Sequence, residues 1–206
     1  MSRSFLPDPA LPLFPLQTVL FPDGLLELKI FETRYLDLMA RCMREQTPFG
    51  VVALRSGGEA RASGATVALF ELGTLAELIE VDSPEANILL VRCRGGQRFR
   101  LGPTRQEADG LWVGEASPVA DDPLVAPSAS HGNVVKSLVD AVAALSAQGA
   151  EPFLAPHRFD SAGWVANRWC EILPLPLDAK VRLLSLDPLA RLDIVDSLMR
   201  VRHTPH

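Results

Sequence analysis

The amino-acid sequence predicts an α+β fold, in which a β-rich half containing one early helix is followed by an α-helical bundle. Residues 11–118 hold many short extended segments separated by glycine and proline turns, and one segment of helical period interrupts them. After a stretch rich in proline and small residues, the remaining chain repeats apolar residues at helical spacing. Short strands of this kind favour a small mixed or antiparallel barrel. The expected divisions are a leader at 1–10, a β-rich subdomain at 11–118, a linker at 119–129 and a helical subdomain at 130–206.

Composition and charge are those of an ordinary globular protein. The 206 residues are 48% hydrophobic and 22% charged. The net charge of −5 and the isoelectric point near 5.4 argue against a general binder of nucleic acids or anionic membranes. Proline and aspartate interrupt the N-terminal region where a signal peptide needs an apolar run, and no run is long enough to span a bilayer. We therefore expect a cytoplasmic protein that does not associate with membranes.

The segment at 11–43 is expected to form the first folding unit. Pro12 and Pro15 exclude a helix, and they are expected to place the first strand at a sheet edge or barrel rim, because proline cannot donate a backbone hydrogen bond. The sequence Phe-Pro-Asp-Gly at 21–24 predicts a turn, after which residues 25–30 return as a strand. From about Glu32 the period becomes helical, with an apolar face formed by Tyr35, Leu36, Met39, Cys42 and Met43.

The remainder of the β-rich half is predicted from apolar runs and turn residues. A loop is expected at 56–59, a chain break at 82–85 and a tight reversal at Gly95-Gly96, so that the segments on either side of the two glycines pair as a hairpin. The strands expected between these breaks lie at 49–54, 65–71, 74–81, 87–92, 97–101 and 111–116.

The helical half carries clear start and stop signals. Asp160 or Ser161 can cap one helix, and Asp187 followed by Pro188 predicts the start of the last one. Gly149 is a candidate C-cap for the first helix of this half. The expected helices and their buried faces are 134–148 with Val135, Leu138, Val139, Val142 and Leu145; 161–173 with Trp164, Val165, Trp169, Ile172 and Leu173; 178–186; and a last helix from 188 with Leu189, Leu192, Val195, Leu198 and Met199.

Three blocks of sequence carry a family resemblance when they are taken together. They are LPLFPLQTVLFPDGLLELKIFETRYLDLM at 11–39, GTLAELIEVDSPEANILLVRCRGGQRFRL at 73–101 and ILPLPLDAKVRLLSLDPLARLDIVDSLM at 172–199. In this order they resemble the Lon N-terminal domain, the substrate-recognition region of the ATP-dependent Lon proteases. The resemblance implies a PUA-like pseudo-barrel followed by helices, and it implies a module that binds polypeptide without catalysis.

Signatures of Lon-type and other hydrolytic chemistry are absent from the sequence. There is no GxxxxGK[ST] loop, since none of the three lysines follows a glycine, and there is no GxSxG or HExxH motif. Cys42, Cys93 and Cys170 lack metal-ligand spacing and are expected as small buried hydrophobes. We expect no catalytic residue, metal or cofactor. An unrecognised hydrolase remains an alternative, because a Ser/His/Asp site can be assembled from distant segments, although His131 and His157 are expected at the surface.

Four arginines around the two glycines offer a second alternative. On a hairpin, Arg92, Arg94, Arg98 and Arg100 would cluster beside Phe99 as an anion or RNA patch, a use that some PUA-like folds have. The favoured interpretation is a solvated face, in which these arginines pair with Glu71, Glu77 or Glu80, or a structural salt bridge.

The leading hypothesis is a polypeptide-binding module, which could serve as an adaptor in proteolysis or protein quality control. Arg34 could hold a carboxylate or carbonyl of a bound peptide, but an ion pair with Glu32 at the helix start is favoured. For the two tryptophans of the helical half, Trp164 and Trp169, packing in the core is favoured. The expected partner is a polypeptide segment or a protein, and the candidate peptide-binding residues are Phe14, Phe21, Arg34, Tyr35 and Trp164.

Overall fold

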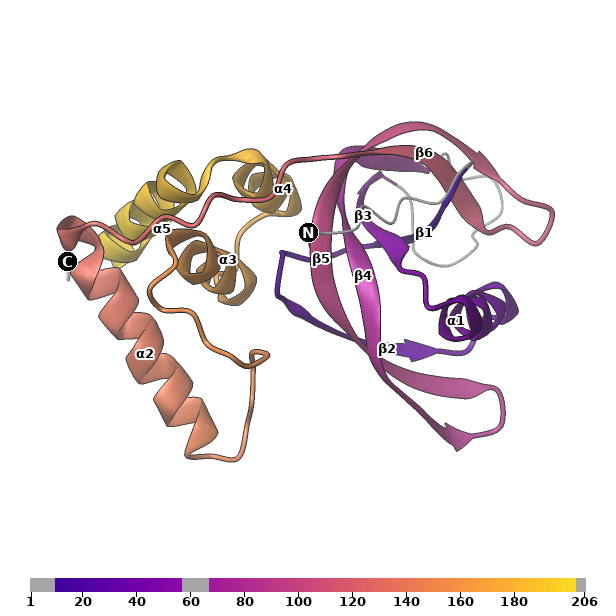
Figure 1. Cartoon of the computed structure of the whole chain (residues 1–206), viewed down its shortest axis with the longest axis horizontal. Coiled ribbons are helices and arrows are strands. Elements are labelled where there is room, and N and C mark those ends of the chain that lie inside the picture. Colours follow the sequence, from indigo (N-terminus) through magenta and orange to yellow (C-terminus); the bar gives the residue numbers. More distant parts are fainter. Residues whose placement is uncertain (1–9, 57–66, 203–206) are drawn as a thin grey trace. The chain divides into compact units, whose positions relative to one another are not determined.

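The structure, a computed structural model, describes residues 10–56 and 67–202 of the chain (Figure 1). It divides into two compact units, Met1–Ala120 and Asp121–His206. The first unit holds the strands and one helix, and the second holds the remaining helices, so the predicted α+β class is confirmed. Each unit is described by itself.

The strands of the first unit form one mixed sheet that closes on itself. Neighbouring strands follow the order β2-β5-β4-β3-β1-β6, and β5 also pairs with β6. Five strands therefore close into a barrel, and β2 extends the sheet beside the first half of β5. β1 and β3 run parallel, whereas the other pairs are antiparallel. The strands are β1 (Leu11–Leu16), β2 (Leu25–Ile30), β3 (Phe49–Ser56), β4 (Ala68–Glu85), β5 (Ile88–Gln106) and β6 (Trp112–Pro118).

The first strand does not lie at an edge, so that prediction was wrong. β1 lies between β3 and β6 and is buried along its whole length. It pairs with β6 over residues 11–13 and with β3 over residues 13–16, and the two ladders overlap at Leu13. Pro12 and Pro15 each fall where one neighbour is registered, so a missing N–H at either position does not interrupt two ladders at once.

The long strands β4 and β5 correct the predicted chain breaks. Asp82–Glu85 was expected as a break but continues β4, and Gly95-Gly96 was expected as a reversal but lies inside β5. The chain reverses instead between Glu85 and Ile88, where Asn87 adopts a φ of 62°. Figure 1 shows this end of the β4–β5 hairpin projecting as a two-stranded arm. The start of the strand predicted at 65–71 and most of the loop predicted at 56–59 lie outside the described residues.

A β-bulge at Gly95-Gly96 allows β5 to contribute side chains to two hydrophobic cores. Ala76 is registered with Gly95 and Thr74 with Arg98, so two steps along β4 match three steps along β5. The extra residue reverses the in-and-out alternation of β5. Its first half faces a core under α1, together with Phe14 and Phe49, and its second half faces the barrel interior. The buried β5 residues are Val91 and Cys93 in the first core, and Phe99 and Leu101 in the second.

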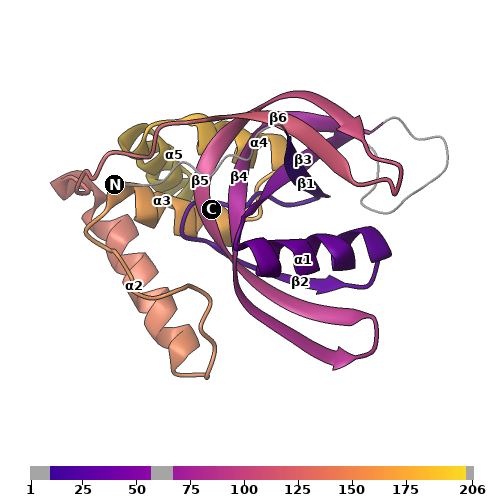
Figure 2. The ribbon, with the colours of Figure 1, turned by 45° about the vertical axis from the view of Figure 1, so that its right-hand side comes forward.

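Helix α1 (Thr33–Glu45) covers the first of these cores, and Figure 2 shows it along its length. Glu32 is its N-cap, as the sequence predicted to within one residue. Its buried residues are Arg34, Tyr35, Leu38, Met39 and Cys42. Met43, expected on the buried face, is 46% exposed, because the apolar stripe is centred on Leu38 instead.

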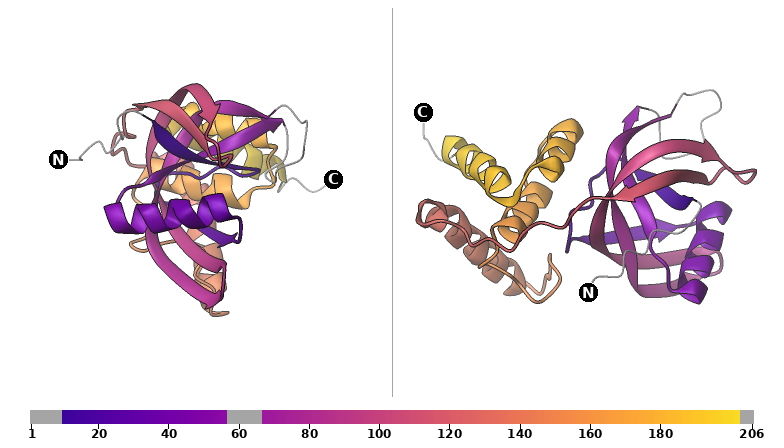
Figure 3. Two further views of the ribbon diagram at one scale, coloured as in Figure 1. Left: turned by 90° about the vertical axis from the view of Figure 1, so that its right-hand side faces the viewer. Right: turned by 45° about the horizontal axis from the view of Figure 1, so that its top comes forward.

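The second unit consists of η1 (Ala129–His131), α2 (Gly132–Ser146), α3 (Ala162–Ile172), α4 (Leu177–Ser185) and α5 (Pro188–Arg202), shown from two further directions in Figure 3. The predicted caps are confirmed, since Ser161 accepts a hydrogen bond from the Trp164 amide and Asp187 accepts one from the Ala190 amide. Gly149, the candidate C-cap, is not the cap: it has a φ of 79° but lies two residues beyond the C-cap of α2, which is Ala147. Val139 was expected inside but is 39% exposed, because the buried face of α2 is formed by Val134, Leu138 and Val142. Ile172 was also expected inside but is 44% exposed, because the buried part of α3 is 162–170.

A buried arginine holds the second unit together. The Arg191 side chain on α5 is fully buried, and its Nη1 donates to Asp122 Oδ2 at 2.8 Å and to the side-chain oxygen of Asn167. Its Nε donates to the Leu183 carbonyl at 2.8 Å, and its Nη2 donates to the Leu186 carbonyl at 2.6 Å. One guanidinium therefore connects α5, α3, the end of α4 and the segment that precedes η1.

Candidate functional site

Three of the candidate peptide-binding residues meet at the start of α1. The Phe14 and Tyr35 rings stack with centroids 3.9 Å apart and planes inclined by 14°. The Arg34 guanidinium lies 4.6 Å from the centre of the Tyr35 ring, pairs with Glu32 at 2.8 Å, and donates to the Gly110 carbonyl at 2.8 Å. The expected ion pair at the helix start is therefore present. All three candidate side chains are buried, at 9% exposed or less.

Phe21 lies in the turn that attaches the start of β2 to β5. The Asp23 amide donates to the Gly95 carbonyl at 2.7 Å, and the Gly95 amide donates to the Gly24 carbonyl at 2.9 Å. A Cβ at position 95 would clash with the Phe21 carbonyl oxygen, so the close approach requires glycine. The Phe21 side chain is fully buried. The Phe21 carbonyl accepts the Gly24 amide at 2.9 Å, which closes the turn.

Trp164 belongs to the second unit, in a cluster of aromatic rings. The ring centroids of Phe153, His157 and Phe159 lie 6.0, 5.7 and 5.2 Å from that of Trp164. Trp164 is 3% exposed and Trp169 is 6% exposed, so the packing favoured for both is confirmed. The Trp169 indole N–H donates to the Val134 carbonyl at 3.0 Å. The structure thus groups Phe14, Arg34 and Tyr35 together and places Phe21 and Trp164 elsewhere.

The exposed apolar side chains of the first unit are residues that sequence reasoning missed. Phe31, between β2 and α1, is 66% exposed, and Met43, Ile79 and Leu90 are 46%, 43% and 42% exposed. Ile79 is the extra residue of a second bulge, since Leu78 is registered with Cys93 and Glu80 with Arg92. The signal for Phe31 was strand alternation: Ile30 is buried, so the next side chain points outward.

The four arginines do not form a patch, so the alternative of a hairpin cluster is not supported, whereas the favoured pairing with Glu80 is present for Arg92. They lie along one strand, and the bulge at Gly95-Gly96 directs Arg92 and Arg94 to one face of the sheet and Arg98 and Arg100 to the other. Arg92 pairs with Glu80 at 2.9 Å and with Glu27 at 3.3 Å, and the hydrogen bond to Glu80 raises the pKa of its guanidinium. Arg98 is 7% exposed and donates to the Ala120 carbonyl at 2.9 Å.

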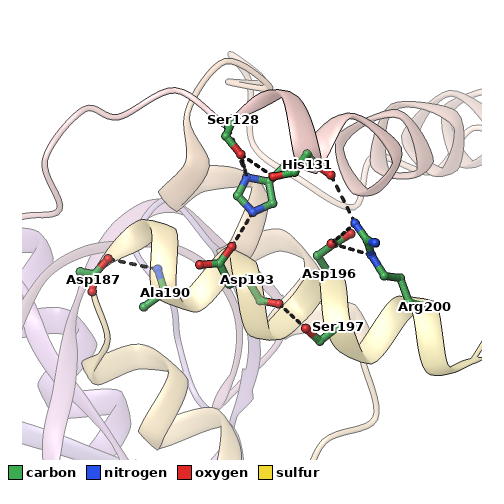
Figure 4. A network of polar contacts seen from close by, with 9 residues as sticks. Ser128, His131, Asp187, Ala190, Asp193, Asp196, Ser197 and Arg200 are labelled. Carbon is green, nitrogen blue, oxygen red and sulfur yellow. Dashed lines mark hydrogen bonds and ion pairs between the residues drawn. The ribbon is translucent and has the colours of Figure 1, made fainter.

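A Ser/His/Asp contact set does occur in the second unit, at the position where a surface histidine was expected (Figure 4). His131 is in fact 3% exposed. Its Nε2 lies 2.7 Å from Asp193 Oδ1, and its Nδ1 lies 2.9 Å from Ser128 Oγ. Because Nδ1 also accepts the Ser128 backbone N–H at 3.2 Å, the network assigns the ring proton to Nε2, which donates to Asp193.

This contact set is a helix cap that docks onto α5. Ser128 is the N-cap of η1, and its backbone and side chain form a capping box with His131. Arg200 pairs with Asp196 at 2.7 Å and donates to the Ser130 carbonyl at 3.4 Å, one helical turn further along α5. The geometry joins two segments that are 62 residues apart in the chain.

Burial disfavours the reactive thiolate form of the three cysteines. Desolvation raises the pKa of the Cys42 thiol to about 11 and those of Cys93 and Cys170 to about 12, so all three stay protonated near neutral pH. Within the described residues no group of histidine, cysteine and acidic side chains could hold a metal ion. No helix in residues 10–56 and 67–202 is long and apolar enough to cross a membrane.

Comparisons with known proteins agree on one family. A model of the ATP-dependent protease La (LON) substrate-binding domain matches residues 10–201. A search of curated proteins found no match. Among solved structures, a Lon N-terminal domain protein from Xanthomonas campestris is 31% identical with a TM-score of 0.72, over 91% of this chain and 97% of that one. The N-terminal domain of a Mycobacterium avium complex Lon protease shares the fold at 14% identity and a TM-score of 0.54, over 90% and 95%. This chain is a member of the family of Lon substrate-binding domains.

Proposed function

We propose that this protein recognises polypeptide segments and catalyses no reaction on them. Membership of the substrate-binding domain family over residues 10–201 is the observation that carries the proposal. Two further observations support it. The first unit exposes large apolar side chains, and Glu80, which follows the exposed Ile79, is engaged in an ion pair with Arg92.

Phe31 is the side chain that we propose as the main contact. It is the most exposed aromatic residue in the described part of the chain, at 66%, and exposed aromatic residues are frequent anchors of binding surfaces. The backbone on either side of it is fixed, because Ile30 packs in the core and Glu32 pairs with Arg34. In this proposal the start of α1, which follows Phe31, is held rigid by Phe14, Arg34 and Tyr35. A rigid contact surface lowers the entropic cost of binding.

Phe21 and Trp164 have a more distant part in the proposal. Phe21 fixes the turn before β2, and a bound segment would meet its side chain only if that turn opened. Trp164 would contribute through the stability of the second unit, where it packs among other rings.

Replacement of Phe31 tests the proposal. Fluorescence anisotropy would follow the binding of labelled peptides taken from an unfolded protein. We expect saturable binding by the native chain and at least about fivefold weaker binding by Phe31→Ala, the loss typical of an anchor side chain. Leu124→Ala is the matched control, because Leu124 is also exposed, at 83%, but lies in the second unit. Equal binding by the native chain and Phe31→Ala would rule out Phe31 as the main contact. No binding by either chain would contradict the proposed function.

Four finer statements belong to the same proposal. We propose that the protein works in the cytoplasm, as an adaptor in proteolysis or protein quality control, and that its barrel is of the PUA-like type. We also propose that the functional parts of the chain follow the division expected from sequence. These parts are a β-rich part at 11–118, a linker at 119–129 and a helical part at 130–206. Mild crosslinking followed by affinity purification tests the adaptor role. Recovery of an ATP-dependent protease or its substrates is expected, and recovery of neither would contradict it.

The Ser128, His131 and Asp193 contacts support a second candidate, a hydrolase. Against it, Ser128 and His131 are three residues apart in one capping box, which explains their contact without chemistry. A fluorophosphonate probe distinguishes the two. We expect no labelling, whereas stoichiometric labelling that disappears in Ser128→Ala would establish a reactive serine. For the RNA alternative, we expect no salt-dependent binding of short RNAs, because the four arginines are divided between two faces.

A further inference from the structure

The strand β2 has a free and regular edge. On one side, all six of its residues are registered with β5 without a shift, and on the other side no strand of the described residues pairs with it. It contains no proline. The arm of β4 at 77–85, which extends beyond the ladder with β3, is different: it carries two register shifts, Pro84 and four acidic residues. Bulges, proline and charge are the usual means of preventing edge pairing; β2 has no bulge and no proline, and its only charges are one acid and one base, Glu27 and Lys29.

The backbone of β2 presents hydrogen-bonding groups along this edge. Just before the strand, the Gly95 amide donates to the Gly24 carbonyl, which fixes Gly24 as a position directed at β5. Antiparallel pairing alternates from residue to residue. Alternate residues of β2 therefore direct their N–H and C=O groups to β5, and the others direct theirs to the free side. The first set is Leu26, Leu28 and Ile30, and the second set is Leu25, Glu27 and Lys29.

The side chains divide between the two faces in the same way. Leu26, Leu28 and Ile30 pack against the core under α1, whereas Glu27 and Lys29 are exposed on the outer face. Glu27 continues a row of alternating charges across three strands, because Glu80 pairs with Arg92 and Arg92 pairs with Glu27. Lys29 is registered with Leu90 and has no ion-pair partner among the residues described. The next strand in this row would place a cation beside Glu27 and an anion beside Lys29.

The chain itself satisfies this requirement. We propose that two copies associate through antiparallel pairing of their β2 edges, on a two-fold axis at Leu28. In this register Glu27 of each copy lies opposite Lys29 of the other, and Leu26 lies opposite Ile30 on the inner face. Both residues of the charged pair direct their backbone groups to the free edge, so they also form the hydrogen-bonded positions of the new ladder.

Charge selects this register over its neighbours. A shift of two residues in either direction sets Glu27 opposite Glu27 or Lys29 opposite Lys29, and like charges directly opposite are destabilising. A shift of one residue sets an outward side chain against an inward one, which the pleat does not allow. The association is an isologous two-fold contact and would join two sheets into one. It does not rest on polypeptide binding by Phe31.

A charge exchange tests the proposal through the oligomeric state. In Glu27→Lys both positions are cationic, and in Lys29→Glu both are anionic, so each variant faces like charges in its own dimer. Sedimentation velocity over a concentration series is expected to show a dimerising native chain and about tenfold weaker dimerisation of each variant. An equimolar mixture of the two variants restores opposite charges at both pairs, and a heterodimer is expected. Glu85→Lys, the same charge change at the far end of the arm, is expected to dimerise like the native chain.

Three results would overturn the proposal. They are a native chain that stays monomeric at all accessible concentrations, a dimer that neither variant weakens, and a mixture that stays monomeric. If the native chain is monomeric and its peptide binding is lost in Glu27→Lys, the edge would be assigned to an extended polypeptide instead. Urea unfolding of each variant checks that the fold persists, which is expected because Arg92 keeps its pair with Glu80 when Glu27 is replaced.

Discussion

Removal of the Arg191 guanidinium is expected to be the most damaging single change in the helical unit. Arg191→Leu keeps most of the side-chain volume and removes the donors. Asp122, whose side chain is 17% exposed, would lose its cation, and the Asn167 oxygen and the carbonyls of Leu183 and Leu186 would lose a donor. The surrounding helices leave little room for water to replace it, since Arg191 is fully buried.

The size of the effect follows from these lost contacts. Loss of the hydrogen bond to each neutral acceptor costs about 0.5–1.5 kcal/mol, and loss of the one to the carboxylate costs about 1.5–3 kcal/mol. Together they agree with the roughly 3–5 kcal/mol that is usual when one partner of a buried ion pair is removed. Since domains of this size are stable by about 5–15 kcal/mol, the helical unit would lose a large part of its free energy of unfolding.

Urea unfolding measures this loss. Four of the five α-helices in the described residues and two of the three tryptophans, Trp164 and Trp169, lie in the second unit, so helical circular dichroism and tryptophan fluorescence report mainly on it. For a slope of about 2 kcal/mol per molar urea, the unfolding midpoint should fall by about 2 M. Arg182→Leu on α4 is the matched control, because Arg182 is exposed, and its midpoint should move by the equivalent of about 0.5 kcal/mol or less. A loss below about 1 kcal/mol for Arg191→Leu would refute the reasoning.

Three further changes test other parts of the structure. Gly95→Ala should destabilise the first unit by more than about 2 kcal/mol in urea unfolding, because its Cβ would clash with the Phe21 carbonyl. Gly102→Ala is the control and should be tolerated, because the nearest neighbour of its Cβ would lie at 3.4 Å. Equal effects of the two substitutions would contradict the close approach at Gly95. Arg34→Met should cost about 1–3 kcal/mol by losing Glu32 and the Gly110 carbonyl, and Arg34→Lys should cost less. The Cys170 thiol ionises near its ordinary pKa of 9.0 when unfolded but at about 12 when folded, so it contributes stability below pH 9 that is lost as pH rises toward 12. Over that range the native chain should lose up to about 1.4 kcal/mol more per pH unit than Cys170→Ala, and parallel pH profiles would contradict a buried thiol.

Local signals in the sequence predicted the helical elements well. Asp187-Pro188 and Ser161 start their helices as expected, because caps act within one turn and need no tertiary information. The turn at 21–24 and the helix after Glu32 depend on equally local chemistry. The buried faces were less accurate, because an exposed Val139 or Ile172 differs from a buried one only in what packs against it.

The errors in the β-rich half have one physical origin. Glycine pairs are common in turns, but Gly95-Gly96 is a bulge inside a strand, and its closeness to the Phe21 carbonyl depends on a segment 74 residues earlier in the chain. Pro12 and Pro15 predict an edge strand, but β1 changes its registered neighbour between them. Long-range pairing of this kind leaves no local trace.

The candidate site could be predicted only in part. The Glu32–Arg34 pair was expected from the helix start, while the stacking of Phe14 on Tyr35 joins two separate elements. Arg191 was missed, although one signal was available: it lies on the same helical stripe as Pro188, Leu192 and Val195, where an exposed charge would not be placed.

A comparison of two forms of one protein ligand tests whether this protein recognises polypeptide without catalysis. Isothermal titration of the full chain against a small disulfide-bonded protein, first folded and then reduced and carboxymethylated, presents the same sequence with its segments hidden or accessible. We expect saturable binding of the unfolded form, no binding of the folded form, and an intact ligand after long incubation. Equal binding of both forms, or a ligand that is cleaved during the incubation, would contradict it.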